Sequence, residues 1–203
     1  GGNEPFWSAT LEAGQMRITR LGLPDLILAI VAEDADGSGL RITAADPAHA
    51  RDAVLTRRPM ICRETMTGMP HPETVTLALG KDWFTGCGGA PADLLAATPW
   101  QITEIRGTPA LAEVPLDLRF DPEGRITGQG GCNGWSASYY LTGEGLGIGP
   151  MAATRMACTP PIMDQETRLF AALARVTRFD ITDVGALVLL SGGTPVLVAQ
   201  PAP

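Results

Sequence analysis

Lysine is almost absent from this 203-residue sequence, and the shortage of basic residues excludes two classes of partner. Lys81 is the only lysine, and 15 Lys and Arg residues stand against 22 Asp and Glu, which gives a formal net charge of −7. An acidic chain without a basic cluster repels the phosphate backbone of nucleic acids and the anionic headgroups of membranes. We therefore expect neither of them as a binding partner.

Long apolar runs are also lacking. The longest, residues 26–32, is far shorter than the roughly 20 residues that a membrane-spanning helix needs. The sequence opens on Gly1-Gly2 and shows no signal peptide. We expect a leader, or a cysteine that carries a lipid anchor, to precede Gly1.

Metal-ligand spacings are missing as well. There is no C-x-x-C, and neither His49 nor His71 is spaced with a cysteine as zinc ligands are. The segment DADGSG, residues 34–39, begins like a calcium-binding loop, but its twelfth position is Ala45, where a bidentate Glu is needed. Asp-Gly between apolar runs is also typical of a hairpin turn, which we favour. We expect no metal and no other cofactor.

Signatures of catalysis are equally sparse. The segment GGCNG, residues 130–134, has the glycines of a nucleophile elbow, but the aromatic stretch after it indicates a strand instead of a helix. No P-loop or dinucleotide motif is present. Nothing singles out a catalytic pair among the acidic residues available for glycoside chemistry, Glu64, Glu73, Glu104 and Asp117. We expect no enzymatic activity and no catalytic residue.

The sequence does contain four cysteines: Cys62, Cys87, Cys132 and Cys158. They allow three disulfide connectivities. The matched separations from 62 to 87 and from 132 to 158 favour one bridge in each half of the chain. Disulfides would indicate an oxidising compartment, here the bacterial periplasm or cell surface.

The sequence contains 24 Gly and 17 Pro, and such frequent helix-breaking residues favour short strands joined by turns. Residues 16–21 alternate between apolar and polar side chains, as a half-buried strand does. We predict a mainly β, β-rich α+β fold of two small domains, residues 1–96 and 97–203, with a linker near residues 90–99.

One helix is expected at about residues 159–177. Thr159 is a candidate N-cap, and prolines are tolerated in the turn that follows it. Arg175 and Arg178 would lie near the helix end and complement its dipole. The predicted apolar stripe comprises Ile162, Met163, Leu169, Phe170, Leu173 and Val176.

Three motifs in the second half carry a family resemblance. Gly131-Cys132-Asn133 with Tyr139 downstream is followed by ATRMAC at residues 153–158, and then by Gln165-Glu166 with Phe170. In this order they resemble the META domain family, which includes the HslJ-type heat-shock lipoproteins. Family members usually have a glycine where this chain has Ala137. The first half, with GNEPFWS at residues 2–8 and GCG at 86–88, resembles an uncharacterised envelope domain that accompanies META domains.

The META resemblance implies an incomplete antiparallel β-barrel packed on one helix, in an exported protein that is often an outer-membrane lipoprotein. It also implies a link to stress or antibiotic tolerance and supports pairing of Cys132 with Cys158. No catalytic residue is carried over.

Three functional hypotheses follow. The first is a non-enzymatic periplasmic scaffold or binding module. The second is a protein that holds a small apolar or lipid ligand between helix and barrel, lined by Trp135, Tyr139, Met156 and Phe170. The third is an inhibitor or partner of an envelope enzyme that acts through an exposed loop at residues 63–72.

Overall fold

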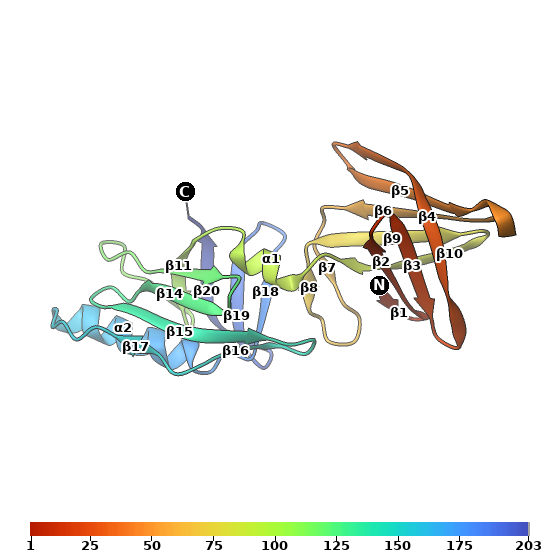
Figure 1. The fold of residues 1–203 in the computed structure, drawn as a ribbon. Coiled ribbons are helices and arrows are strands. Elements are labelled where there is room, and N and C mark those ends of the chain that lie inside the picture. Colours follow the sequence, from red (N-terminus) through yellow and green to blue (C-terminus); the bar gives the residue numbers. More distant parts are fainter. Residues whose placement is uncertain (203) are drawn as a thin grey trace. The chain divides into compact units, whose positions relative to one another are not determined.

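The computed structural model describes residues 1–202 and divides the chain into two compact units, Gly1–Ala90 and Pro91–Pro203. Both are built from antiparallel strands, which confirms the predicted mainly β class (Figure 1). The units divide before helix α1 (Pro91–Ala96), whereas the sequence-based division lies after it. Leu95 is fully buried and its carbonyl accepts a hydrogen bond from Trp100 Nε1 at 2.8 Å, so α1 is fastened to the C-terminal unit.

The N-terminal unit is an eight-stranded sheet that curls back on itself. Its strands pair in the order β1 (Gly2–Asn3), β2 (Phe6–Glu12), β3 (Gln15–Arg20), β4 (Leu23–Asp36), β5 (Gly39–Asp46), β6 (Arg51–Arg58), β9 (Glu73–Leu79) and β10 (Asp82–Gly88). A short 3₁₀ helix (Pro47–His49) precedes β6, and β7 (Cys62–Arg63) pairs with β8 (Pro70–His71) as a separate ribbon. The ends of the sheet meet where the Gly1 nitrogen donates to the Cys87 carbonyl at 2.7 Å and the Cys87 N–H donates to the Gly1 carbonyl at 2.8 Å.

The core of this unit follows from strand periodicity, because alternate side chains of a strand point to opposite faces. In β3, Met16 and Ile18 are fully buried, while Arg17 between them is exposed. The same alternation places Leu55 and Leu77 inside. The result is an interior filled by apolar side chains, as in small closed barrels.

The turn between β4 and β5 contains the segment that resembles a calcium loop. The Asp36 carboxylate accepts hydrogen bonds from the Ser38 N–H at 2.7 Å and the Ser38 hydroxyl at 2.6 Å. Asp36 is paired across the hairpin with Gly39, which has a φ of +147°. The Asp36 side chain therefore stabilises the hairpin turn that was predicted from the sequence.

The C-terminal unit contains a second antiparallel sheet, with ten strands in the described part. Eight of them pair in the order β16 (Leu146–Ile148), β15 (Gly134–Leu141), β14 (Arg125–Gln129), β13 (Asp117–Asp121), β11 (Trp100–Ile105), β20 (Thr194–Pro201), β19 (Leu187–Ser191) and β18 (Arg178–Ile181). The short strands β12 (Thr108–Pro109) and β17 (Ala152–Ala153) pair with β11 and β15. The edges approach each other where the Leu146 N–H donates to the Thr177 carbonyl at 2.9 Å, which leaves a nearly closed barrel.

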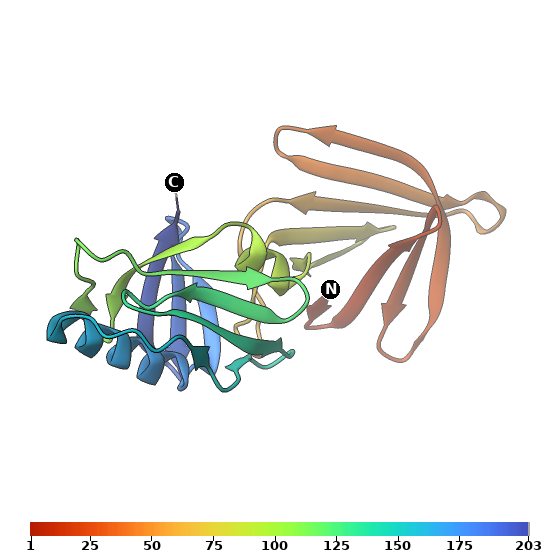
Figure 2. The same cartoon turned by 60° about the vertical axis from the view of Figure 1, so that its left-hand side comes forward.

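Helix α2 (Pro160–Leu173) packs on β11 and β20 and lies along this barrel (Figure 2). Thr159 occupies the N-cap position, although its side chain makes no capping hydrogen bond. The helix ends at Leu173, four residues before the predicted end at 177, because Arg178 pairs with Leu190 as the first residue of β18. The predicted basic last turn is therefore wrong.

The buried face of α2 also differs from the predicted stripe. It comprises Gln165, Glu166, Leu169, Ala172 and Leu173. Two polar residues thus lie toward the core, while the predicted stripe residues Ile162, Met163 and Phe170 are half-buried. Neither helix in residues 1–202 has the length and apolar character needed to cross a bilayer.

Candidate functional site

The four cysteines form one disulfide in each unit, in the pairing that the spacing suggested. Cys62 bonds to Cys87 and Cys132 bonds to Cys158, with Cα–Cα distances of 5.4 and 5.9 Å. The first bridge ties the β7–β8 ribbon to β10. The second ties the start of β15 to the segment that leads into α2. Cys132 therefore has no thiol to act as a nucleophile while the bridge is intact.

A buried polar cluster lies next to the second disulfide and joins the barrel to the helix. Glu166 and Asn133 are 5% and 3% exposed. The Asn133 backbone N–H donates to Glu166 Oε2, and the Asn133 side-chain amide donates to Glu166 Oε1, both at 2.7 Å. Each carboxylate oxygen thus has its own donor, which is the arrangement that makes burial of a charged group tolerable.

The other end of the Asn133 side chain holds an exposed segment. Asn133 Oδ1 accepts hydrogen bonds from the Thr154 hydroxyl at 2.8 Å and from the Met156 N–H at 2.7 Å. With the disulfide at Cys158, residues 154–158 are thus anchored at three alternate positions, although the whole segment is exposed. One asparagine thus positions both the helix and the irregular segment that precedes it.

The glycines before Cys132 make room for this cluster. A Cβ on Gly130 would lie 2.6 Å from Glu166 Oε2, closer than non-bonded atoms approach. Gly131 adopts a φ of +102°, which side chains rarely tolerate. The two glycines therefore allow the turn and the close approach of the glutamate, a structural role.

Gln165 is the second buried polar residue of α2. Its Oε1 accepts a hydrogen bond from the Leu111 N–H at 2.7 Å and fixes the loop before β13 to the helix. Its buried Nε2 has no hydrogen-bond partner among the described residues. Gln165 and Glu166 were part of the recognised motif, but their position on the buried face was not predicted. The spacing of 165, 166, 169, 172 and 173, typical of one helix face, is the signal that could have shown it.

The four predicted ligand-binding residues do not gather at one point. Trp135 and Phe170 meet edge to face with ring centroids 6.2 Å apart. Tyr139 packs on Phe120 at 5.0 Å instead, and its hydroxyl donates to the Asp121 carbonyl at 2.8 Å. Met156 is 58% exposed. Burial and the nearby Asp121 raise the pKa of Tyr139 above its ordinary value of 10.0.

Of the acidic residues considered for catalysis, three have structural partners. Glu73 forms a two-pronged ion pair with Arg57 at 2.6 and 2.8 Å. Glu64 accepts hydrogen bonds from Thr67 and Met66, which lower the pKa of its carboxyl. Asp117 accepts from the Gln129 N–H at 3.1 Å.

The histidines lie apart from these groups. His49 Nδ1 lies 2.6 Å from Asp46 Oδ2, and His71 Nδ1 lies 3.0 Å from the Gly89 carbonyl. Within residues 1–202, no three His, Cys, Asp or Glu side chains cluster as metal ligands would.

Comparison with known proteins identifies the C-terminal unit. No curated protein matches the chain. Among solved structures, an NMR structure with 21% identity covers 56% of this chain and 96% of its own, with a TM-score of 0.45. Another, of a protein from Burkholderia xenovorans, has 23% identity, covers 60% of this chain and 96% of its own, and gives a TM-score of 0.46. The META domain model matches residues 93–203, more than half of the chain, and the chain therefore belongs to the META domain family.

Proposed function

We propose that this chain is a non-enzymatic binding module of the bacterial envelope, exported to the periplasm or the outer membrane. The observation that carries the proposal is the presence of one disulfide in each unit. Such bridges persist in oxidising compartments and are rare in the cytosol. A protein with a disulfide in each of its two units is suited to work outside the reducing cytosol.

The binding role, in preference to catalysis, is supported by how the polar groups are used. The Cys132 sulfur is bonded to Cys158, and each oxygen of the Glu166 carboxylate accepts a hydrogen bond from Asn133. Glu73 is neutralised by Arg57. A nucleophile or general base needs a free lone pair directed at the substrate, and these groups direct theirs at the protein.

The finer assignment extends the family membership. We assign the C-terminal unit to the HslJ-like lipoproteins and the N-terminal unit to the envelope domain that accompanies META domains. A lipid on a cysteine before Gly1 would anchor the protein to the outer membrane, and its role would lie in heat-shock or antibiotic tolerance. Survival of a deletion strain after heat or drug exposure tests this role, and survival equal to that of the parent strain overturns it.

The export proposal is tested by trapping thiols in living cells. Cells are quenched in acid and alkylated before lysis, and the peptides are mapped without reduction. The expected result is linkage of Cys62 to Cys87 and of Cys132 to Cys158 in the periplasmic or membrane fraction. Four alkylated cysteines in the cytosolic fraction would overturn the proposal.

A protein partner is the second candidate, favoured by the loop between β7 and β8. The Glu64 carboxylate accepts from the Met66 N–H, the Thr67 N–H and the Thr67 hydroxyl at 2.6 to 3.0 Å, and the disulfide holds one base of the loop. Met66, at its tip, is 78% exposed. A loop ordered before binding loses less entropy on docking.

Replacing Met66 with Asp tests this candidate, with Met60→Asp as the matched control because Met60 is 58% exposed outside the loop. Capture from periplasmic extract should lose a specific enzyme with Met66→Asp and retain it with Met60→Asp. An unchanged set of captured proteins removes the candidate.

A small apolar ligand between α2 and the barrel is the third candidate. The form of it that the structure favours is a lipid with one acceptor oxygen, because Trp135 Nε1 is a buried donor without a hydrogen-bond partner in the described residues. Native mass spectrometry of protein purified from its own envelope should show a bound mass that Trp135→Phe reduces. Protein that carries no added mass removes this candidate.

A further inference from the structure

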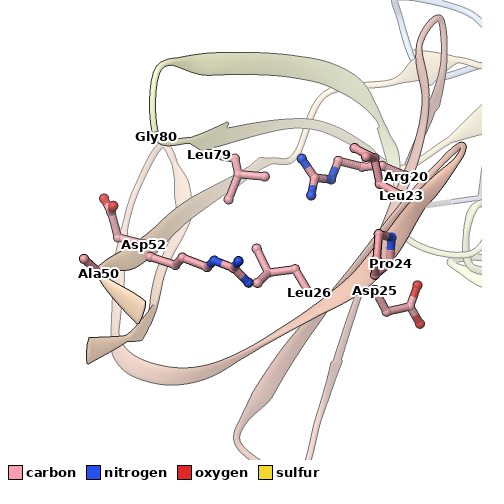
Figure 3. A pocket seen from close by; sticks show the side chains of 10 residues that line it. Arg20, Leu23, Pro24, Asp25, Leu26, Ala50, Asp52, Leu79 and Gly80 are labelled. Carbon is pink, nitrogen blue, oxygen red and sulfur yellow. The ribbon is translucent and has the colours of Figure 1, made fainter. Parts of the chain in front are cut away.

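One end of the N-terminal barrel contains a cavity of about 440 Å³. It is bounded by the turn between β3 and β4, the start of β6 and the turn between β9 and β10 (Figure 3). Leu26 and Leu79 contribute its apolar side, and Arg20 and Arg51 contribute two guanidinium groups. Cavities of about 300 to 1,000 Å³ at barrel mouths are typical of small-molecule sites.

Strand periodicity places both arginines on the inner face. Arg20 pairs directly with Trp7, which is 1% exposed, and paired residues of antiparallel strands share a face. Arg51 is two residues from the buried Ala53 in β6, so it continues the inward series. Arg20 Nε is buried and has no hydrogen-bond partner in residues 1–202, so no carboxylate of the described residues pairs with this edge of the guanidinium group.

The neighbouring carboxylates are engaged elsewhere. Asp25 accepts from Arg17 at 3.1 Å and from Thr19 at 2.8 Å on the outer face. Figure 3 shows the Asp25 and Asp52 carboxylates directed away from the space between Arg20 and Leu79. Asp46, paired with Arg51 across the strands, accepts from the Ala48 N–H and lies 2.6 Å from His49 Nδ1. The cavity is thus lined by two arginines and two aspartates, and both of these carboxylates point away from the space beside Arg20, which leaves the two guanidinium groups as its candidate anion-binding groups.

We propose that this mouth binds a small organic anion with an apolar tail. The anionic group, a carboxylate or sulfonate, accepts hydrogen bonds from Arg20 and Arg51, and the tail lies on Leu26 and Leu79. Guanidinium groups recognise such oxyanions through charge-assisted hydrogen bonds. The inference deepens the proposed binding role, on which it rests, by naming a ligand class and a site in the N-terminal unit.

The test is a titration of the full chain with octanoate, followed by calorimetry and by amide shifts of the residues around the mouth. Octanol and octylammonium have the same tail with a neutral or opposite head. We expect octanoate to bind at least about tenfold more tightly than either, since one charge-assisted contact contributes about that factor.

Three variants with the same change of charge locate the site. Arg20→Gln and Arg51→Gln should each weaken octanoate binding about tenfold or more. Arg41→Gln is the matched control, because Arg41 is exposed on β5 and lies outside the cavity lining, and this variant should bind octanoate as the native chain does. Arg51 is exposed, so its replacement leaves the fold intact.

Several outcomes overturn the inference. Equal binding of octanoate and octanol removes the anion preference, and unchanged binding by Arg20→Gln and Arg51→Gln removes the site. If octanoate does not bind at millimolar concentration, the proposal of a free organic anion as ligand is overturned. The same holds if the protein co-sediments with phosphatidylglycerol vesicles and octanoate does not displace it. Thiol trapping tests export independently, and binding that persists without the two arginines would leave the general binding role intact.

Discussion

The two units close their sheets in different ways. In the N-terminal unit, the first residues of the chain hydrogen-bond to β10, and an apolar core fills the interior. In the C-terminal unit, the edges β16 and β18 meet only loosely, and helix α2 lies along the barrel. Glu166 on that helix is hydrogen-bonded to Asn133 at the start of the sheet.

The difference shows what each kind of closure requires. Backbone closure requires small residues where the edges meet, because a Cβ on Gly86 would lie 1.9 Å from the Gly1 carbonyl oxygen. A helix makes no backbone hydrogen bonds with the neighbouring strands, so closure with a helix requires side-chain contacts that fix its position. A buried carboxylate with two matched donors supplies that position with directionality that apolar packing lacks.

Removal of either disulfide should give the largest difference in stability between the two units. The bridges span 25 and 26 residues, so the chain-entropy model gives each about 3.5 kcal/mol of unfolding free energy. We expect Cys62→Ser/Cys87→Ser to destabilise only the N-terminal unit and Cys132→Ser/Cys158→Ser only the C-terminal unit. Urea unfolding followed by amide signals of each unit measures both. Equal loss in both units from one double variant would show that they unfold as one.

Glu166→Gln addresses the helix contact alone. The new amide would place a donor against one of the two Asn133 donors, and Asn133 cannot rotate because its Oδ1 is held by Thr154 and Met156. We expect a loss of about 3 kcal/mol in the unfolding free energy of the C-terminal unit. The exposed Glu144→Gln is the control. A loss below about 0.5 kcal/mol would mean that apolar packing alone positions α2.

Gly86→Ala tests backbone closure in the N-terminal unit. The added methyl group forces β1 away from β10, and we expect a cost of about 2 kcal/mol. Faster hydrogen exchange at the Cys87 amide, which donates to Gly1, would locate the opening. Gly37→Ala, where a Cβ meets open space, should have little effect. Unaltered exchange at Cys87 in Gly86→Ala would contradict the closure that we describe.

Tyr139→Phe is the mildest change. It removes the hydrogen bond to Asp121 and should cost about 1 kcal/mol at neutral pH. Because the folded pKa is raised above 10.0, the contribution of the neutral phenol is complete below pH 10 and declines as the pH rises above it. Stability curves of the native chain should therefore fall more steeply above pH 10 than those of Tyr139→Phe. Parallel curves would exclude this linkage.

The sequence predicted what depends on local pattern. Alternation around Met16 and Ile18 indicated strands, because a period of two is a short-range property. Contacts between residues far apart in the sequence were not predicted. An example is the hydrogen bond between Asn133 and Glu166, which are 33 positions apart. The helix end at Leu173 was missed because Arg175 and Val176 continue the helical pattern, while β18 competes for the chain. Arg20 and Arg51 resemble ordinary surface residues until the barrel brings both strand ends to one mouth.

The three-point anchoring of residues 154–158 has a consequence for proteolysis. Arg155 is exposed and is a cleavage site for trypsin-like proteases, which must draw an extended segment into their cleft. The Thr154 side chain and the Met156 N–H are both hydrogen-bonded to Asn133, and Cys158 is bonded to Cys132. The flanks of Arg155 are therefore held to the barrel surface at three points. Reduction of the disulfide would release one of them, and we expect trypsin to cleave after Arg155 faster in the reduced protein than in the oxidised protein.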